Sequence, residues 1–266
     1  MNITFIGGGN MATAIIGGLA GGAHQIRVVE PGEDKRQQLA ADFGVTSLAA
    51  LPDAFGPQDI IVLAVKPQVL REVCQQLAPV LGGALVISIA AGIGITAMAG
   101  WLGSERIVRV MPNTPAMVGK GVSGLYAAAN VAQADRDNAT AIMAAVGTTT
   151  WLAAESGIDD ITSVSGSGPA YVFYFIESMI EGAVQAGFAE DEARRLVLDT
   201  FEGAVALARQ SPLPVATLRQ NVMSKGGTTE RAILRFEAEG VKPAIIAGAL
   251  DCRARSVELG IELSKD

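Results

Sequence analysis

The sequence predicts an α/β protein with a doubly wound parallel sheet in its first part and an all-helical second part. Short β-prone runs alternate with helical stretches up to about residue 160. A glycine-rich turn directly follows the first of these runs, and no convincing strand occurs after residue 160. We therefore expect two domains, an α/β one over residues 1–160 and a helical one over residues 161–266.

The first part contains strands that suit a sheet covered by helices on both faces. The run DIIVLAV is apolar on every side, as expected for a central parallel strand, and Pro67 suits the first turn of the helix that follows it. Helices are predicted over Met11–Leu19 and Asp34–Asp42. The predicted strands are Ile3–Ile6, Ile26–Val29, Asp59–Val65, Ala84–Ile89 and Arg106–Met111.

The second part contains five predicted helices separated by Gly, Pro or Ser. The segment PAYVFYFIESMI, beginning at Pro169, is apolar nearly all round. It is therefore either the core of its domain or an interface covered by a second subunit. The predicted helices are Pro169–Ala186, Glu190–Arg209, Val215–Val222, Thr228–Glu239 and Pro243–Leu263.

Composition excludes several classes of function. The net charge is -7 and basic residues are not clustered, which argues against nucleic-acid binding. The apolar start is interrupted by Asn10 and reads as strand and helix rather than as a signal peptide, so we expect a cytoplasmic protein without a membrane span. Cys74 and Cys252 lack metal-ligand spacing, so no metal site is expected, and a single histidine, His24, excludes mechanisms that need several imidazoles.

The first turn has the pattern of a Rossmann-type dinucleotide site. Gly7 permits a tight turn after the strand, Gly9 lets the backbone approach a pyrophosphate, and Ala12 keeps helix and strand close. The phosphates then meet the positive end of the helix. A GxGxxG-like motif alone is weak evidence, but here it opens an alternating α/β pattern.

The choice between NADH and NADPH is open. Glu30 ends the second strand, where a carboxylate accepts hydrogen bonds from the ribose hydroxyls of NADH. Lys35 and Arg36 follow closely and can reach the 2'-phosphate of NADPH. Alternatively, Glu30 is simply a solvated loop residue.

Further unusual segments lie at predicted strand ends and helix starts. Ala64-Val65-Lys66-Pro67 and Ala90-Ala91-Gly92 end two strands and are expected to line the same crevice. The segments SGSGPAY, from Ser165, and SKGGTT, from Ser224, place hydroxyl groups just before helices. Such helix starts are either simple N-caps or receptors for a small carboxylate.

These motifs together resemble the pyrroline-5-carboxylate reductase family. The resemblance combines GGGNMA, AVKPQ, AAG, MPNTP, SGSGPAY and SKGGTT, in this order, from residue 3 to about residue 255. It implies reduction of 1-pyrroline-5-carboxylate to L-proline with NADPH or NADH, the last step of proline biosynthesis. It also implies a homodimer through carboxy-terminal helices, assembling to a decamer.

The resemblance also implies site residues. Thr229 and Glu155 are the expected catalytic residues, and both are also expected to bind substrate together with Ser224, Gly227 and Thr228. Met223 and Glu30 depart from the family pattern, which leaves local packing and cofactor preference open. The expected cofactor-binding residues are Gly7, Gly8, Gly9, Asn10, Met11, Ala12, Glu30, Ala64, Val65, Lys66, Pro67, Ile89, Ala90, Ala91 and Asn221.

Two rival functions share parts of this pattern. A β-hydroxyacid dehydrogenase has the same order of domains but carries a catalytic lysine one helical turn after a glycine-rich segment, where this chain has Val172. A nicotinamide-binding sensor without turnover has no need for a substrate receptor such as SKGGTT. Neither the final subunit count nor the acceptance of other cyclic imines follows from the sequence.

Overall fold

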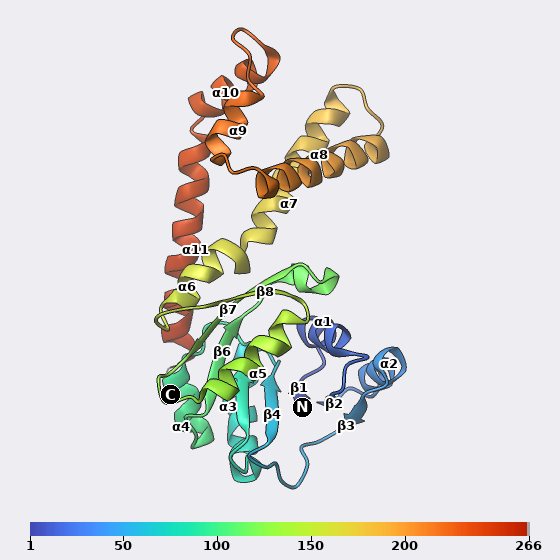
Figure 1. The fold of residues 1–266 in the computed structure, drawn as a ribbon, viewed down its shortest axis with the longest axis vertical. Coiled ribbons are helices and arrows are strands. Elements are labelled where there is room, and N and C mark those ends of the chain that lie inside the picture. Colours follow the sequence, from blue (N-terminus) through green and yellow to red (C-terminus); the bar gives the residue numbers. More distant parts are fainter. Residues whose placement is uncertain (265–266) are drawn as a thin grey trace. The chain divides into compact units, whose positions relative to one another are not determined.

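A computed structural model describes residues 1–264 of the chain (Figure 1). Within them, eight strands form one sheet in the order β3-β2-β1-β4-β5-β6-β7-β8. Neighbours are parallel except β6 and β7, which run antiparallel. The strands are β1 (Asn2–Ile6), β2 (Gln25–Val29), β3 (Thr46–Leu48), β4 (Asp59–Leu63), β5 (Leu85–Ser88), β6 (Ile107–Met111), β7 (Gly121–Ala127) and β8 (Gly147–Trp151).

Helices connect the strands and make up the second part of the chain, which confirms the predicted fold class. Those between strands are α1 (Asn10–Leu19), α2 (Glu33–Phe43), α3 (Pro67–Leu77), α4 (Ile95–Leu102) and α5 (Gln133–Ala144), with short turns η1 (Ala78–Val80) and η2 (Thr114–Val118). Those after the sheet are α6 (Gly157–Ile161), the π-helical turn η3 (Thr162–Gly166), α7 (Gly168–Gln185), α8 (Glu190–Gln210), α9 (Val215–Asn221), α10 (Thr228–Ala238) and α11 (Val241–Leu263).

The register brings three strand ends to one edge of the sheet. Ile6, the last residue of β1, pairs with Val29 on one side and with Leu63 on the other. Beyond the strands, the N–H of Gly7 donates to Val29 O at 2.8 Å, and the N–H of Ala64 donates to Ile6 O at 2.9 Å. The chain crosses from one half of the sheet to the other between β1 and β4, and the crevice at such a switch point is where doubly wound folds bind ligands.

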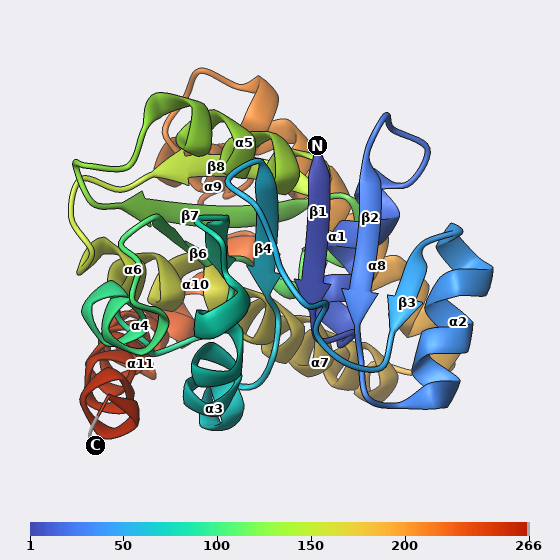
Figure 2. The ribbon, with the colours of Figure 1, turned by 90° about the horizontal axis from the view of Figure 1, so that it is seen from below.

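Helices flank the sheet (Figure 2), and two clusters of buried apolar side chains pack on its two faces. On one face, Ile15 and Ile16 of α1 are fully buried against β1, together with side chains from α2 and α5. On the other, Leu70 and Cys74 of α3 pack on β4 and β5 with side chains from α4. Helices therefore cover both faces of the sheet, and a ligand can reach it at the loops that follow the carboxyl ends of the strands.

Strands β3, β7 and β8 were not predicted from the sequence. Strands β7 and β8 are rich in Gly, Ser and Thr, which weakens the hydrophobic pattern of a strand. Gly121 and Gly147 let the two backbones approach closely, since a Cβ on Gly147 would lie 2.0 Å from Gly121 O. The antiparallel pair β6–β7 makes the sheet mixed rather than purely parallel.

The contacts divide the chain into two units. One comprises Met1–Pro169 together with the chain from Asp251 onward, and the other is Ala170–Leu250. The sequence assigned everything after residue 160 to one helical domain, whereas the end of α11 groups with the sheet. There the hydroxyl of Ser256 donates to Asp159 at 2.7 Å, and Arg253 pairs with Asp160.

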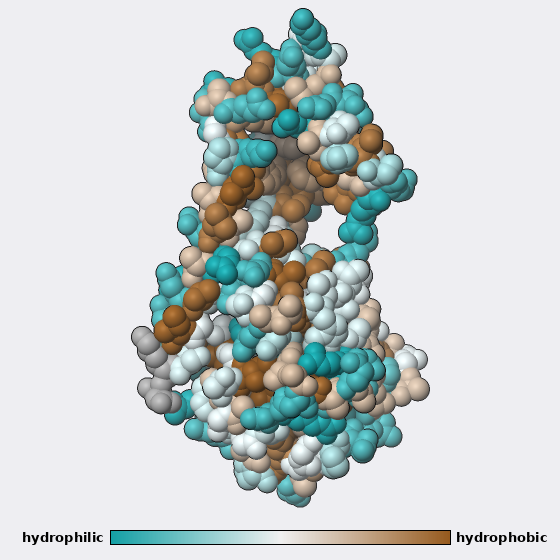
Figure 3. Space-filling model, turned by 60° about the vertical axis from the view of Figure 1, so that its left-hand side comes forward, coloured by the Kyte–Doolittle hydropathy of each residue, from teal (hydrophilic) through white to brown (hydrophobic). Residues whose placement is uncertain are grey.

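The helical unit leaves large apolar side chains uncovered. Phe173 and Tyr174 of α7 are 62% and 67% exposed. Figure 3 shows hydrophobic residues reaching the surface along the helices. Of the two sequence-based alternatives for α7, this exposure favours an interface covered by a second subunit over a simple core. Among the described residues, every helix is too short or too polar to span a lipid bilayer.

Candidate active site

The turn after β1 has the geometry that a bound pyrophosphate requires. Gly7 has a φ of 97°, and a Cβ there would lie 2.8 Å from Ala64 O, so only glycine fits. A Cβ on Gly9 would meet open space, so its backbone faces the solvent side of the turn. Ala12 is 1% exposed in the contact of α1 with the sheet. This geometry is compatible with a close approach of phosphate to the backbone, and the cofactor roles of these residues stay a prediction.

The start of α1 offers backbone donors to an anion. Gly9 is its N-cap residue and, in the described chain, no side chain caps the helix. The first N–H groups of a helix have no partner within it and carry a partial positive charge. Asn10 and Met11 begin the helix at this end. The turn and the helix start together form a site for phosphate groups.

Glu30 lies directly beside this turn. One oxygen of its carboxylate accepts the N–H of Gly8 at 2.9 Å, and the other accepts the N–H of Gly32 at 2.8 Å. The guanidinium of Arg36 donates to the carbonyl oxygens of Glu30 at 2.8 Å and Pro31 at 2.6 Å. The carboxylate is therefore held in one orientation by the backbone on both sides, rather than being a freely solvated loop residue.

A cleft of about 680 Å³ runs along this edge of the sheet. It is formed by the loops after β1, β2, β3 and β4 and by one side of α3. Seven of the predicted cofactor-binding residues line it, namely Gly7, Gly8, Gly9, Glu30, Ala64, Val65 and Lys66. Pro67 follows as the first residue of α3. The glycine turn, the unpartnered helix start and the cleft fit a dinucleotide.

The loop after β5 is the next part of the same edge. The N–H of Ile89 donates to Leu63 O at 3.1 Å, which ties the loop to β4. Ala90 is 5% exposed and its N–H lies 3.4 Å from the hydroxyl of Ser88, whereas Ala91 is exposed. The loop thus presents small residues and backbone next to the strands that carry the cleft.

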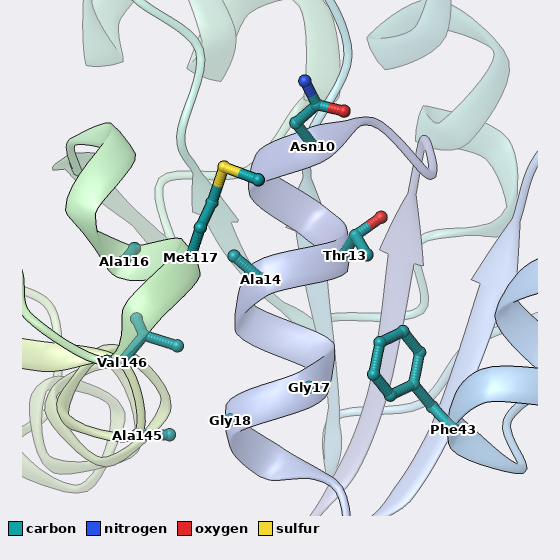
Figure 4. Close-up of a pocket in the computed structure, with 11 residues that line it drawn as sticks. Asn10, Thr13, Ala14, Gly17, Gly18, Phe43, Ala116, Met117, Ala145 and Val146 are labelled. Atoms are coloured by element: carbon teal, nitrogen blue, oxygen red, sulfur yellow. The ribbon is translucent and has the colours of Figure 1, made fainter. Parts of the chain in front are cut away.

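A separate cavity lies along α1. It has a volume of about 290 Å³ and is lined by α1, η2, the turn between α5 and β8, and Phe43 at the end of α2 (Figure 4). Asn10 and Met117 both line it, and the amide group of Asn10 points away from the residues further along α1 (Figure 4). Gly18 allows α1 to pack here, because a Cβ would lie 2.6 Å from Ala145 O.

Glu155 is engaged within the first unit. Its Oε1 accepts the N–H of Ile95, the first residue of α4, at 2.7 Å and a guanidinium N–H of Arg109 at 3.0 Å. The Arg109 side chain is 7% exposed and that of Glu155 is 31% exposed. Sequence reasoning missed Arg109 and Ile95, because they lie 46 and 60 residues away from Glu155 along the chain. The expected substrate role of Glu155 stays a prediction.

The segment MPNTP ties two motifs together. The amide group of Asn113 donates to Ser165 O at 2.9 Å, and its oxygen accepts the N–H of Val122 at 2.8 Å. The hydroxyl of Ser165, in η3, donates to Ile161 O, at the end of α6, at 3.2 Å. Asn113 is 7% exposed. These contacts give SGSGPAY a structural function beside any role in binding.

The segment SKGGTT forms the start of α10 in the helical unit. Gly226 has a φ of 72°, and Gly227 is the N-cap residue whose N–H donates to Ser224 O at 2.9 Å. The helix begins with Thr228, which is exposed, and Thr229, which is half-buried. Asn221 is the last residue of α9, shortly before this segment. This unit therefore carries the predicted carboxylate receptor at a helix start.

Glu230 directly follows this segment, and the sequence analysis did not single it out. Its carboxylate accepts the N–H of Gly226 at 2.6 Å. A Glu in the first turn that reaches back to a preceding N–H is typical of a helix start, so the pattern was available in the sequence. In the described chain, acidic, histidine and cysteine side chains do not gather into a set that could hold a metal ion.

Comparison with known proteins indicates the family to which this chain belongs. Residues 155–259 match the model described as pyrroline-5-carboxylate reductase dimerisation, and residues 2–92 match that of NADP oxidoreductase, coenzyme F420-dependent. The pyrroline-5-carboxylate reductase of Pseudomonas aeruginosa is 44% identical, over 99% of this chain and 98% of its own length. That of Pasteurella multocida is 42% identical, over 97% of each chain.

Solved structures agree over the whole chain. The pyrroline-5-carboxylate reductase of Coxiella burnetii superposes with a TM-score of 0.86 at 37% identity, covering 97% of this chain and 98% of that one. The pyrroline carboxylate reductase of Plasmodium falciparum, solved with NADP bound, has a TM-score of 0.86 at 30% identity, covering 98% of each. This full-length similarity covers both the glycine turn with its cleft and the helical unit. The chain therefore belongs to the pyrroline-5-carboxylate reductase family.

Proposed function

We propose that this chain reduces 1-pyrroline-5-carboxylate to L-proline with NADPH or NADH, the last step of proline biosynthesis. The observation that carries the proposal is the full-length similarity to curated reductases of this name. The cleft beside the glycine turn supports the cofactor half of the reaction, and the start of α10 supports the substrate half. A reductase needs both halves, whereas a nicotinamide-binding sensor without turnover needs only the cofactor half.

The residues of the first unit hold the cofactor. The turn of Gly7, Gly8 and Gly9 lets the pyrophosphate approach, the first N–H groups of α1 bind it, and Glu30 faces the adenosine ribose. The loops from Ala64 and from Ile89 flank the rest of the cleft. When bound, the reduced nicotinamide supplies a hydride for the imine carbon, so the protein has only to position the reactants, polarise the imine and exclude water.

The start of α10 receives the substrate in this proposal. The first N–H groups of α10, including those of Thr228 and Thr229, have no partner within the helix and favour a carboxylate. The hydroxyl of Ser224 lies beside Gly227, where a Cβ would be 2.3 Å from it. Glycine at this position therefore leaves room for the Ser224 hydroxyl. Ser224 and Thr228 hold the substrate carboxylate through hydroxyl and N–H groups, and Gly227, whose N–H donates to Ser224 O, shapes the turn between them.

Thr229 acts on the ring nitrogen in this proposal. A cyclic imine can arrive at the enzyme already protonated, so no strong acid is required at the site. The hydroxyl of Thr229 accepts a hydrogen bond from the protonated nitrogen and fixes the ring. Losing a hydrogen bond to a charged group costs about 1.5 to 3 kcal/mol, which corresponds to roughly ten- to a hundredfold in kcat/KM.

The chain works as a homo-oligomer in this proposal. The exposed Phe173 and Tyr174 of α7 support a subunit interface, as does the match of residues 155–259 to a dimerisation model. We further propose that dimers assemble to a decamer and that the protein is cytoplasmic. The apolar exposure explains the dimer, whereas the number of dimers in the particle rests on the family resemblance alone.

Kinetics of Thr229 variants test the proposal. Wild-type protein should oxidise the reduced cofactor when 1-pyrroline-5-carboxylate is added, and Thr229→Ala should lower kcat/KM roughly ten- to a hundredfold. Thr229→Ser keeps the hydroxyl and should recover most of the activity. Thr46→Ala, on the exposed side of β3, serves as a control for loss of a threonine. An unchanged kcat/KM in Thr229→Ala would refute the assignment.

A further inference from the structure

We infer that Glu30 makes this chain prefer NADH to NADPH. The inference deepens the proposed function and rests on the cofactor occupying the cleft beside the glycine turn. The sequence left the choice open between the carboxylate of Glu30 and the cations of Lys35 and Arg36. In the structure these three side chains have different hydrogen-bond partners, and the partners determine which of them can meet a cofactor.

The carboxylate of Glu30 is fixed at the adenosine end of the cleft. Its two oxygens are divided between the N–H of Gly8 at 2.9 Å and the N–H of Gly32 at 2.8 Å. Gly8 belongs to the turn that receives the pyrophosphate, so the acid is tied to the phosphate site itself. A carboxylate oxygen can accept further hydrogen bonds while keeping the present ones. The Glu30 carboxylate can therefore accept hydrogen bonds from a ligand without changing its position.

The two cofactors differ at the position that such a carboxylate meets. The adenosine ribose of NADH has two neighbouring hydroxyls, which donate hydrogen bonds to an acid at the end of the second strand. In NADPH one of these hydroxyls is replaced by a phosphate. A phosphate monoester carries a charge of about -1.5 to -2 at neutral pH and offers acceptor oxygens. Glu30 therefore gains hydrogen bonds from NADH and repels NADPH.

Of the two neighbouring cations, Arg36 supports the turn that carries Glu30, and Lys35 contacts Gln38 instead. Arg36 donates from one nitrogen to the carbonyl oxygens of Glu30 and Pro31, and so closes the turn that carries the acid. Lys35 lies in the first turns of α2, and its ammonium group donates to Gln38 at 3.3 Å. Both cations still attract a phosphate at a distance. We therefore expect a preference of about tenfold or more, rather than complete exclusion of NADPH.

Space beside the carboxylate is also limited. A Cβ on Gly8 would lie 2.8 Å from a methyl group of Leu39 and 3.3 Å from the Glu30 carboxylate. A Cβ on Gly32 would lie 3.1 Å from the other carboxylate oxygen. Glycine on both sides allows the acid to approach the backbone, so the carboxylate cannot turn away from an incoming 2'-phosphate without losing both hydrogen bonds.

Direct binding measurements test the inference without turnover. We would measure the Kd of NADH and of NADPH for the wild-type oligomer by cofactor fluorescence, with no substrate present. NADH should bind at least about tenfold more tightly, which corresponds to roughly 1.4 kcal/mol. Glu30→Ser should abolish or reverse the ratio, and Glu30→Gln should reduce it while keeping an amide oxygen as acceptor. Glu33→Gln, which removes an exposed carboxylate from the start of α2, should change the ratio less than about twofold.

The outcomes separate this inference from the proposed function. Equal or tighter binding of NADPH by the wild-type protein overturns the inference and leaves the reductase proposal intact. A ratio unchanged in both Glu30 variants, with melting temperatures like that of the wild-type protein, also overturns it. If neither cofactor binds to the folded oligomer, the proposed function itself fails.

Discussion

Removing the carboxylate of Glu155 should destabilise the first unit. The Arg109 side chain, 7% exposed, would lose its ion-pair partner, and the N–H of Ile95 would lose its acceptor at the start of α4. In the described chain, the Nε of Arg109 already has no hydrogen-bond partner. Without Glu155, this cation would keep little compensation for its burial.

The magnitude follows from these contacts. Breaking a fully buried ion pair from one side costs about 3 to 5 kcal/mol. Because the Glu155 side chain is 31% exposed, water can replace part of the interaction. We therefore expect Glu155→Ala to cost about 3 kcal/mol. For a chain of this size, roughly 2 to 4 °C accompany each kcal/mol, so the melting temperature should fall by roughly 6 to 12 °C.

Thermal unfolding at a fixed protein concentration measures this change, since oligomer stability depends on concentration. Glu155→Gln keeps one acceptor and should lose less stability than the alanine variant. Glu33→Ala, which removes an exposed acid, should melt like the wild-type protein. An unchanged melting temperature in Glu155→Ala would refute the reasoning. A Glu155→Gln variant with wild-type stability and a large loss of kcat/KM would instead support the substrate role that the family resemblance implies.

Further predictions concern packing, ionisation and assembly. In a urea titration, Gly18→Ala should lower the free energy of unfolding by about 1 to 3 kcal/mol, because the added methyl group would overlap the backbone of Ala145. Gly100→Ala places its methyl group in open space and should leave that free energy unchanged or raise it. Burial raises the pKa of Cys74 to about 12. The thiol should therefore resist alkylation at pH 8 in the native protein, while half-buried Cys252 reacts. The free energy of unfolding should fall as the pH rises from about 9 towards 12, because the thiol ionises in the unfolded chain first. Fast labelling of Cys74 in the native protein would contradict this. Phe173→Asp should lower the particle mass in analytical ultracentrifugation, and an unchanged mass would exclude this face of α7 from the interface.

Much of the fold followed from local patterns. The apolar run in β4 and the glycine turn after β1 are sequence features that require particular surroundings, so their positions could be predicted. Strand β7 could not, because Gly121 and Gly124 serve close packing rather than a hydrophobic alternation. The end of α11 was predicted as helix, but nothing in its pattern indicates that it packs with the sheet.

The candidate site likewise has parts that the sequence predicts and parts that it does not. Glu30 was predicted because it follows a strand at a fixed distance from the glycine turn, and the structure places it against that turn. The contact of Glu155 with Arg109 and Ile95 could not be predicted, because it joins residues far apart in the chain whose individual neighbourhoods look ordinary. The role of Thr229 rests on the family resemblance and its helix-start position, and it awaits kinetics.

The most direct test of the central claim is the stoichiometry of the reaction. Purified protein is mixed with reduced cofactor and 1-pyrroline-5-carboxylate, and the loss of cofactor absorbance is compared with the amount of proline formed. The account predicts one L-proline for each NADH or NADPH consumed, and no consumption without the imine. Folded, oligomeric protein that consumes neither cofactor, or consumes it without forming L-proline, would contradict the account.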